Sequence, residues 1–188
     1  MQRFVLALVI MGLAATGCLS YTGGARPAQL ATLAQDPAWM LAPVPTVRQQ
    51  NRNDCGIAAL DMVLQRWGQH VPRATVLAEV GPLTEHGVAL GALRDVALQH
   101  GLAAFVVVAN RSDLEYELTA GRPVLVGLLR PHGSARQSHF EVVVGLQRTS
   151  GAIATVDPGS GPQVRTWHDF ADEWDAAGRP ALVVLGPP

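Results

Sequence analysis

The sequence contains two cysteines, Cys18 and Cys55, and Cys55 is the candidate nucleophile. It precedes residues 56–67, whose apolar side chains recur at helical spacing, with Asp54 as the expected N-cap. The N–H groups and the positive dipole end of a helix favour a thiolate over a thiol, although the adjacent Asp54 carboxylate acts in the opposite direction. The alternative is a buried structural cysteine, which behaves as a small hydrophobe.

His139 is the candidate base among six histidines, because it opens an expected strand over residues 140–146. A turn near residues 149–151 returns the chain to Asp157, so both residues are expected at the open end of one hairpin. Antiparallel pairing from a turn near residues 149 and 150 is expected to place Asp157 opposite residue 142 or 143. A shared face depends on a register of one residue, which the sequence leaves open. A carboxylate beside imidazole would orient it toward a thiol.

Gln49 lies six residues before Cys55, at a distance that lets a loop return its amide to the helix start. There it could join the Cys55 backbone N–H as an oxyanion hole. Gln50 is an equally good donor on chemical grounds. The histidines show no pairs with metal-ligand spacing, so we expect neither a metal nor another cofactor.

Helical and strand patterns occupy different halves of the chain. Helices are expected over residues 56–67, 74–80 and 89–100, and two more over 114–120 and 167–176. Short strands are expected over residues 104–108, 123–129, 140–146, 153–156 and 181–185. N-terminal helices packed on a C-terminal antiparallel sheet make an α+β fold. One domain over residues 44–186 is the simplest organisation.

The N-terminus has the pattern of an export signal. Residues 1–17 carry one basic residue, an apolar run and small residues directly before Cys18, as in a lipoprotein signal peptide. We therefore expect lipidation of Cys18 and a tether over residues 18–43, with Gly23-Gly24 as flexible linker and a short helical piece between residues 30 and 40. The expected location is the bacterial cell envelope, facing the periplasm, with the outer membrane favoured over the inner one.

Composition limits the class of partner. The chain is 48% hydrophobic and 15% charged with a formal net charge of −1, and its basic residues form no cluster. Nucleic-acid binding requires clustered positive charge and is not expected. Contact with a membrane is expected through the N-terminal lipid only.

Several segments of the chain carry a recognisable pattern: residues 44–49, 54–60, 66–68, 138–145 and 156–158, and further residues 87–101, 121–124 and 170–174. Together these segments resemble the double-glycine-leader (bacteriocin-processing) cysteine peptidases. The resemblance implies a papain-like fold. It also implies that Cys55 is the nucleophile, His139 the general base and acid, Asp157 the orienting carboxylate and Gln49 the oxyanion-hole donor.

Members of that family cut leader peptides after a Gly-Gly pair, commonly as a domain fused to an ATP-driven exporter. The implied partners are a peptide or protein substrate and export machinery. This sequence contains no glycine-rich phosphate loop with lysine, and its export signal points to the other side of the membrane. Two alternatives stay open: a papain-like acyl transferase or amidase that uses the same residues, and an inert peptide-binding domain of a secretion system.

Overall fold

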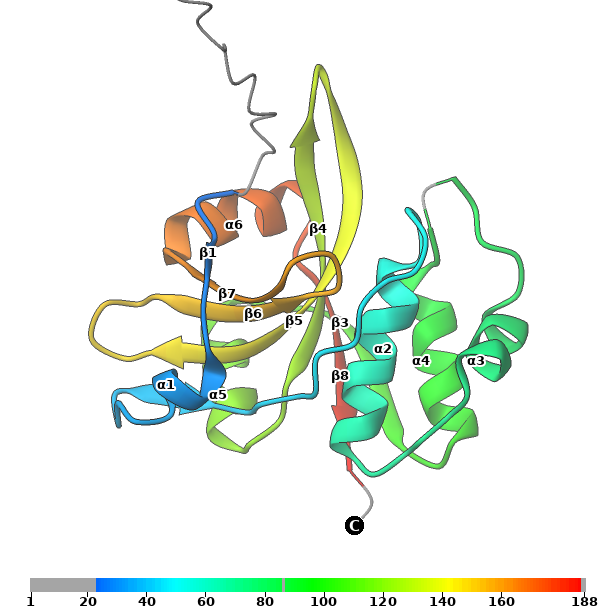
Figure 1. Cartoon of the computed structure of the whole chain (residues 1–188), viewed down its shortest axis with the longest axis horizontal. Coiled ribbons are helices and arrows are strands. Elements are labelled where there is room, and N and C mark those ends of the chain that lie inside the picture. Colours follow the sequence, from blue (N-terminus) through cyan, green and yellow to red (C-terminus); the bar gives the residue numbers. More distant parts are fainter. Residues whose placement is uncertain (1–22, 86, 187–188) are drawn as a thin grey trace, which may run out of the picture.

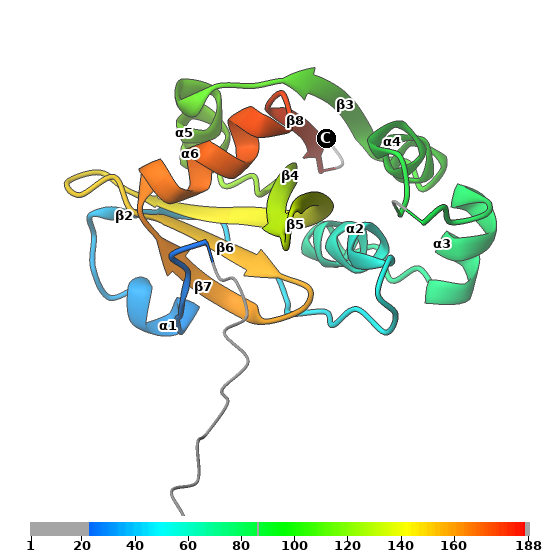
Figure 2. The same cartoon turned by 90° about the horizontal axis from the view of Figure 1, so that it is seen from above.

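A computed structural model describes residues 23–85 and 87–186 of the chain. The signal segment and Cys18 lie outside the described residues. Figure 1 shows a group of helices beside a twisted antiparallel sheet, and the view in Figure 2 shows α6 on one side of the sheet centre and α2 on the other. The fold is the expected α+β arrangement of helices on an antiparallel sheet.

Three helices pack together beside the sheet (Figure 1): α2 (Cys55–Arg66), α3 (Arg73–Val80) and α4 (Leu90–Gln99). Helix α2 is buried along most of its length because small or apolar residues follow Cys55 at nearly every position. Gly68, with a positive φ of 75°, follows its end, where glycine has no steric penalty. This helix was expected over residues 56–67, and its observed boundaries differ from these by one residue at each end.

Within the described residues, eight strands form one sheet: seven follow the order β1-β7-β6-β5-β4-β8-β3, and β2 pairs with β5. Their bounds are β1 Arg26–Pro27, β2 Trp39–Leu41, β3 Ala103–Val108, β4 Val124–His132, β5 Ala135–Gln147, β6 Ile153–Asp157, β7 Gly161–Arg165 and β8 Pro180–Leu185. The sheet carries three more helices: α1 Leu30–Leu33, α5 Arg111–Thr119 and α6 Trp167–Ala176. The sequence pattern did not predict β1, β2 or β7, which are short or contain proline.

A β-bulge lies in the β5–β6 hairpin. Gly145 pairs with Ala154, but Val143 pairs with Thr155, so Val144 is an additional residue on β5. Continuing the pairing beyond Val142 and Val156 brings Asp157 level with residue 141, and the expected position opposite residue 142 or 143 is wrong. The bulge therefore decides the one-residue register that the sequence left open.

Two apolar clusters lie on opposite faces of the sheet. One contains side chains of α2 and α4 together with Val142 and Val144 of β5. The other contains side chains of α5 and α6 together with Val143 of the same strand. Alternation along β5 therefore supplies both cores, as expected for a central strand covered on both faces.

Residues 23–43 belong to the folded domain, although the sequence pattern predicted a tether up to residue 43. Strand β1 pairs with β7, and β2 pairs with β5. Ala42 is fully buried. A strand forms its backbone hydrogen bonds only with a partner strand, and the residue pattern of so short a segment does not reveal that partner.

None of the helices in the described part of the chain has the length and apolar character that a membrane span requires.

Candidate active site

Cys55 is the first residue of α2, and it is 6% exposed. Gly56 beside it is required by close packing, because an added Cβ would lie 2.5 Å from Val88 Cγ1 and 3.0 Å from Phe140 Cδ2. Helix α2 therefore sits tightly against the strand that carries His139 and Phe140. This contact places the start of the helix beside Phe140, the residue that follows the candidate base.

Asp54 occupies the N-cap position of α2, as expected, but its side chain makes no capping hydrogen bond there. The fully buried carboxylate instead accepts hydrogen bonds from the backbone N–H of Asn51 at 2.9 Å and of Gln50 at 3.3 Å, and pairs with Arg73. Asp54 thus shapes the loop that contains residues 49–53. The helix start is left without a capping side chain beside the Cys55 thiol.

Burial raises the pKa of the Cys55 thiol above its ordinary value. The backbone amides of Phe140 and Gly56 lower it in part, whereas the negative charges of Asp157 and Asp54 raise it further. The favourable effect of the helix end, expected from the sequence, is smaller than the cost of desolvation. In the free protein the thiol is therefore the stable form near neutral pH.

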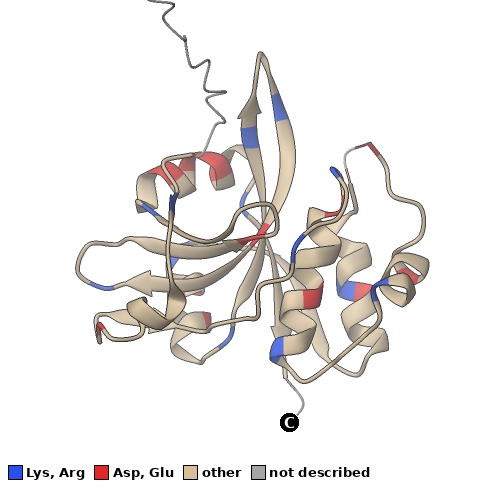
Figure 3. Cartoon of the chain, viewed as in Figure 1, with Lys and Arg blue, Asp and Glu red and all other residues tan. Residues whose placement is uncertain are grey.

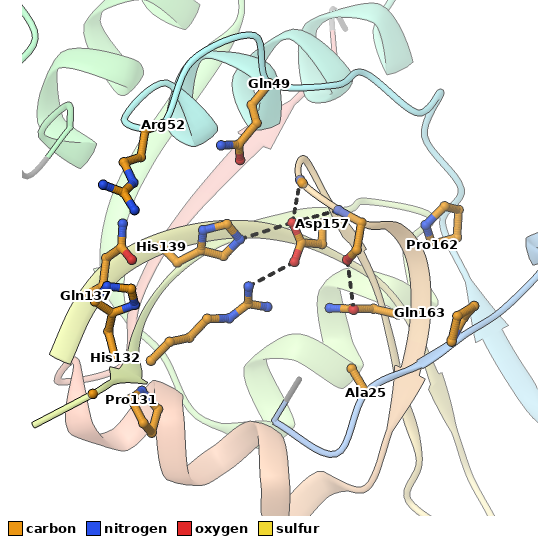
Figure 4. A pocket seen from close by; sticks show the side chains of 15 residues that line it. Ala25, Gln49, Arg52, Pro131, His132, Gln137, His139, Asp157, Pro162 and Gln163 are labelled. Atoms are coloured by element: carbon orange, nitrogen blue, oxygen red, sulfur yellow. Dashed lines mark hydrogen bonds and ion pairs between the residues drawn. The ribbon is translucent and has the colours of Figure 1, made fainter. Parts of the chain in front are cut away.

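His139 and Asp157 meet, as the hairpin pattern predicted. His139 Nε2 lies 3.2 Å from Asp157 Oδ1 (Figure 4), which leaves Nδ1 as the nitrogen that could take a proton from a thiol. The same Asp157 oxygen accepts from the backbone N–H of Gly159 at 2.6 Å. These two donors and the backbone N–H of Ser160, at 3.4 Å, hold Oδ1 in place, and the carboxylate sets the orientation of the imidazole.

The two groups differ in their preferred charge. Burial lowers the pKa of His139, and the nearby Arg130 charge lowers it further, while the hydrogen bond to Asp157 opposes both. Burial disfavours ionised Asp157, but the hydrogen bond and charge of His139 and the charge of Arg130 together hold its pKa well below the ordinary value. Asp157 is therefore a carboxylate and His139 a neutral base near pH 7.

Gln49 reaches the same site from the loop before α2. Its backbone N–H donates to the Pro158 carbonyl at 3.1 Å, so this loop is joined to the turn after Asp157. Its side-chain Nε2 donates to Asn51 O at 3.0 Å, and its buried Oε1 has no hydrogen-bond partner among the residues that the structure describes. The amide lies beside His139 and Asp157 in Figure 4, whereas Gln50 is absent from this cavity lining.

A cavity of about 710 Å³ opens over His139 and Asp157. Its walls come from the N-terminal segment, the loop before α2, the β4–β5 hairpin and β7. They include Ala25, Gln49, Arg52 and Gln163 (Figure 4). Its size suits a peptide segment, but the buried Cys55 is not among the lining residues.

A charged cluster below Asp157 was not predicted from the sequence. It is formed by Arg130, Glu141, Arg165 and Glu173. Glu141 interrupts an apolar strand pattern, which is the one local signal that could have revealed it. Acidic residues also mark α6 in Figure 3, while the other charges are scattered over most elements. The residues of this cluster come from four elements: β4, β5, β7 and α6.

His139, Glu141 and Asp157 place ligand-type atoms within 4.8 Å of one another. A guanidinium, however, already contacts both carboxylates, because Arg130 pairs with Glu141 and with Asp157. A metal ion would have to displace this arginine against charge repulsion. The residues therefore fit an arginine-centred ion cluster better than a metal site.

The profile of the peptidase C39 family matches residues 43–178. Comparison with curated protein sequences returns no match. Among solved structures, a double-glycine-motif protease from an AMS/PCAT transporter, in complex with the leader peptide, is 20% identical with a TM-score of 0.63. It aligns over 78% of this chain and 94% of its own.

The peptidase domain of Streptococcus ComA, a bifunctional ABC transporter of a quorum-sensing pathway, is also 20% identical. Its TM-score is 0.62 over 75% of this chain and 97% of its own. A C39-like peptidase from Bacillus anthracis is 18% identical, with a TM-score of 0.64 over 78% of this chain and 96% of its own. These likenesses concern the fold. Together with the family profile, they establish that this chain belongs to the peptidase C39 family and carries its papain-like peptidase domain.

Proposed function

We propose that this chain is a cysteine endopeptidase that uses Cys55, His139 and Asp157 as its catalytic residues and Gln49 as an oxyanion-hole donor. The observation that carries this proposal is the hydrogen bond from His139 Nε2 to Asp157, made where β5 packs against the start of α2. That bond leaves His139 Nδ1 available to Cys55. Membership in a peptidase family supports the same reaction class.

The directions of the pKa shifts favour a neutral resting pair. Both the raised pKa of Cys55 and the lowered pKa of His139 disfavour a preformed thiolate–imidazolium pair. His139 Nδ1 would then take the thiol proton as Cys55 Sγ attacks the peptide carbonyl. The carbonyl oxygen would accept hydrogen bonds from the Cys55 backbone N–H and the Gln49 amide.

His139 would next give its proton to the leaving amine, which releases the C-terminal product and leaves a thioester on Cys55. A water molecule, deprotonated by His139, would hydrolyse that thioester. Asp157 would remain ionised throughout, because its depressed pKa makes it a poor proton acceptor. Its function in both steps is to orient the imidazole and to stabilise the imidazolium.

The proposed substrate is a peptide with a Gly-Gly pair before the scissile bond. One solved relative is a double-glycine-motif protease bound to its leader peptide, which supports this choice. The protein should cut a synthetic leader-type peptide after the second glycine, as measured by mass spectrometry. Cys55→Ser should abolish the cleavage, with a loss of about 10⁴-fold or more.

Gln49 and Gln50 provide a matched pair for the oxyanion hole. Gln49→Ala should lower kcat by about 100-fold, because one donor to the developing oxyanion is lost. Gln50→Ala should have little effect, because its side chain does not line the cavity. Equal effects of the two substitutions would remove Gln49 from the proposed mechanism.

A peptide-binding domain without catalysis is the second candidate, and the burial of Cys55 favours it. Calorimetry with the same peptide would separate the two functions. Equal affinity for the parent and Cys55→Ser, with the peptide mass unchanged after incubation with the parent, would establish binding alone. An acyl transferase would instead join the N-terminal product to an added amine, which mass spectrometry also detects.

We further propose that the protein is exported and anchored in the bacterial cell envelope by a lipid on Cys18. The apolar run and the small residues before Cys18 support this proposal. Labelling cells with radioactive palmitate should mark the parent and leave Cys18→Ala unlabelled. Label in both proteins, or in neither, would contradict the lipid anchor.

A further inference from the structure

Arg130 on β4 makes an ion pair with each of three carboxylates. Its Nη1 lies 2.9 Å from Asp157 Oδ2, its Nε lies 3.4 Å from Glu173 Oε2, and its Nη2 contacts Glu141 Oε1. The guanidinium is a planar group with donors in fixed directions, so three simultaneous contacts fix its position. Arg130 is therefore held firmly below the candidate base.

Asp157 divides its two oxygens between different partners. Oδ1 accepts hydrogen bonds from His139 Nε2 and from the backbone N–H groups of Gly159 and Ser160. Oδ2 accepts a hydrogen bond from Arg130. Rotation of the carboxylate would break contacts at both oxygens. Arg130 thus fixes the orientation of the carboxylate that faces His139.

The second arginine of the cluster has a different task. Arg165 is fully buried and contacts Glu141 Oε2 at 3.0 Å and Glu173 Oε2 at 2.9 Å. Those two carboxylates therefore keep a cation without Arg130. Within the described residues, Asp157 has its arginine contact with Arg130 alone.

Protonation of His139 changes the net charge of this part of the site. Asp157 and the cluster together contain three carboxylates and two guanidiniums and carry one net negative charge, which an imidazolium would balance. The charged or titratable groups that interact with His139 or line the cavity with it are Asp157 of β6, Arg130 and His132 of β4, Glu141 of β5, Glu173 of α6 and Arg52 of the loop before α2. Arg130 is the cation whose charge lowers the pKa of His139, so it opposes protonation of His139 in the free protein.

We propose that Arg130 is a positioning residue for the reaction, which holds Asp157 Oδ1 toward His139 and keeps His139 unprotonated until the thiol proton arrives. This inference rests on the proposed function of His139 as the base. It assigns Arg130 two separable effects, one through geometry and one through charge.

The charge effect can be measured without a substrate. Proton–carbon NMR of the His139 ring, in the full chain with Cys55→Ser, gives the pKa of His139 directly. Arg130→Met should raise this pKa, whereas Arg130→Lys should leave it near the parent value. Arg48→Met is the matched control, because Arg48 contacts the Gly159 carbonyl in the same turn but no carboxylate of the cluster. It should leave the pKa unchanged.

The geometric effect is measured by peptide hydrolysis. Arg130→Lys should lower kcat by about 10- to 100-fold with little change in KM, because an ammonium cannot hold three carboxylates in one geometry. The double variant Arg130→Met/Glu141→Gln restores the net charge of the cluster and guards against misfolding. It should bring the pKa of His139 back toward the parent value while kcat stays low.

An unchanged His139 pKa in Arg130→Met, or an equal rise in Arg48→Met, would overturn the charge effect. Full recovery of kcat in the double variant would overturn the positioning effect and leave Arg130 a structural residue. If the parent cleaves no peptide, the proposed function fails, and the NMR titration still decides the effect of Arg130 on His139.

Discussion

Cys55 begins a helix buried among apolar side chains, whereas His139 and Asp157 lie above a cluster of buried charges. Apolar packing fixes the nucleophile in space and favours its neutral form. Charged partners fix the carboxylate and keep it ionised. The same sheet is therefore stabilised by apolar packing near Cys55 and by ion pairs near Asp157. The free-energy cost of forming charge falls mainly on the Cys55 thiol.

The largest stability effect should come from the charged side. Arg165→Met would leave Glu141 and Glu173 in the interior with one arginine fewer. We expect the free energy of unfolding to fall by about 3–5 kcal/mol, because an uncompensated buried charge is costly. Urea denaturation measures this loss. Adding Glu173→Gln should recover part of the lost free energy of unfolding. A loss below about 1 kcal/mol in Arg165→Met would show that Arg165 is not essential to the stability of the charged cluster.

The apolar side should respond with a somewhat smaller loss. Leu60→Ala removes a fully buried side chain of α2 and should cost about 3 kcal/mol through lost burial and a cavity. Because no charge is involved, the loss should be the same at pH 6 and pH 8. The exposed Leu98 is the control, since Leu98→Ala should have little effect. A pH-dependent loss at Leu60 would contradict the contrast between the two sides.

Gly56 lies where the two sides meet. Gly56→Ala introduces a Cβ that overlaps Val88 and presses on Phe140, so we expect a loss of about 2 kcal/mol and lower peptidase activity. Gly91→Ala is a matched control, because that helix position has open space. Urea denaturation and peptide cleavage measure the two effects. If Gly56→Ala resembled Gly91→Ala in both, tight packing of α2 on β5 would not matter.

The smallest effect concerns pH. The pKa of folded His139 is lowered, so the unfolded chain binds its proton first as pH falls below about 6.5. His139 therefore stabilises the folded protein above that pH. This contribution is lost as the pH falls toward the pKa that His139 has in the folded state. His139→Gln should flatten the decline in unfolding free energy between about pH 7 and pH 5. Exposed His168→Gln should leave the decline as in the parent.

Local sequence patterns determined much of this protein. Close-packed small and apolar residues predicted α2 and placed Cys55 at its start. The apolar alternation around residues 140–156 predicted the hairpin that carries His139 and Asp157. Both follow from the periods of helices and strands, which neighbouring residues reveal. The outward extension of the β4–β5 hairpin beyond residue 130 was missed, because its mostly exposed residues carry no such pattern.

Contacts between distant segments decided the rest. Arg130 and Arg165 lie outside the strands that the sequence predicted, and only the fold brings Glu141, Asp157 and Glu173 to them. The sequence predicted both strands of the hairpin but left the face of Asp157 open. The additional residue Val144 shifts the pairing by one, which brings Asp157 level with residue 141 and onto the face of His139. A bulge depends on packing against both cores, so tertiary structure alone could align the acid with the imidazole.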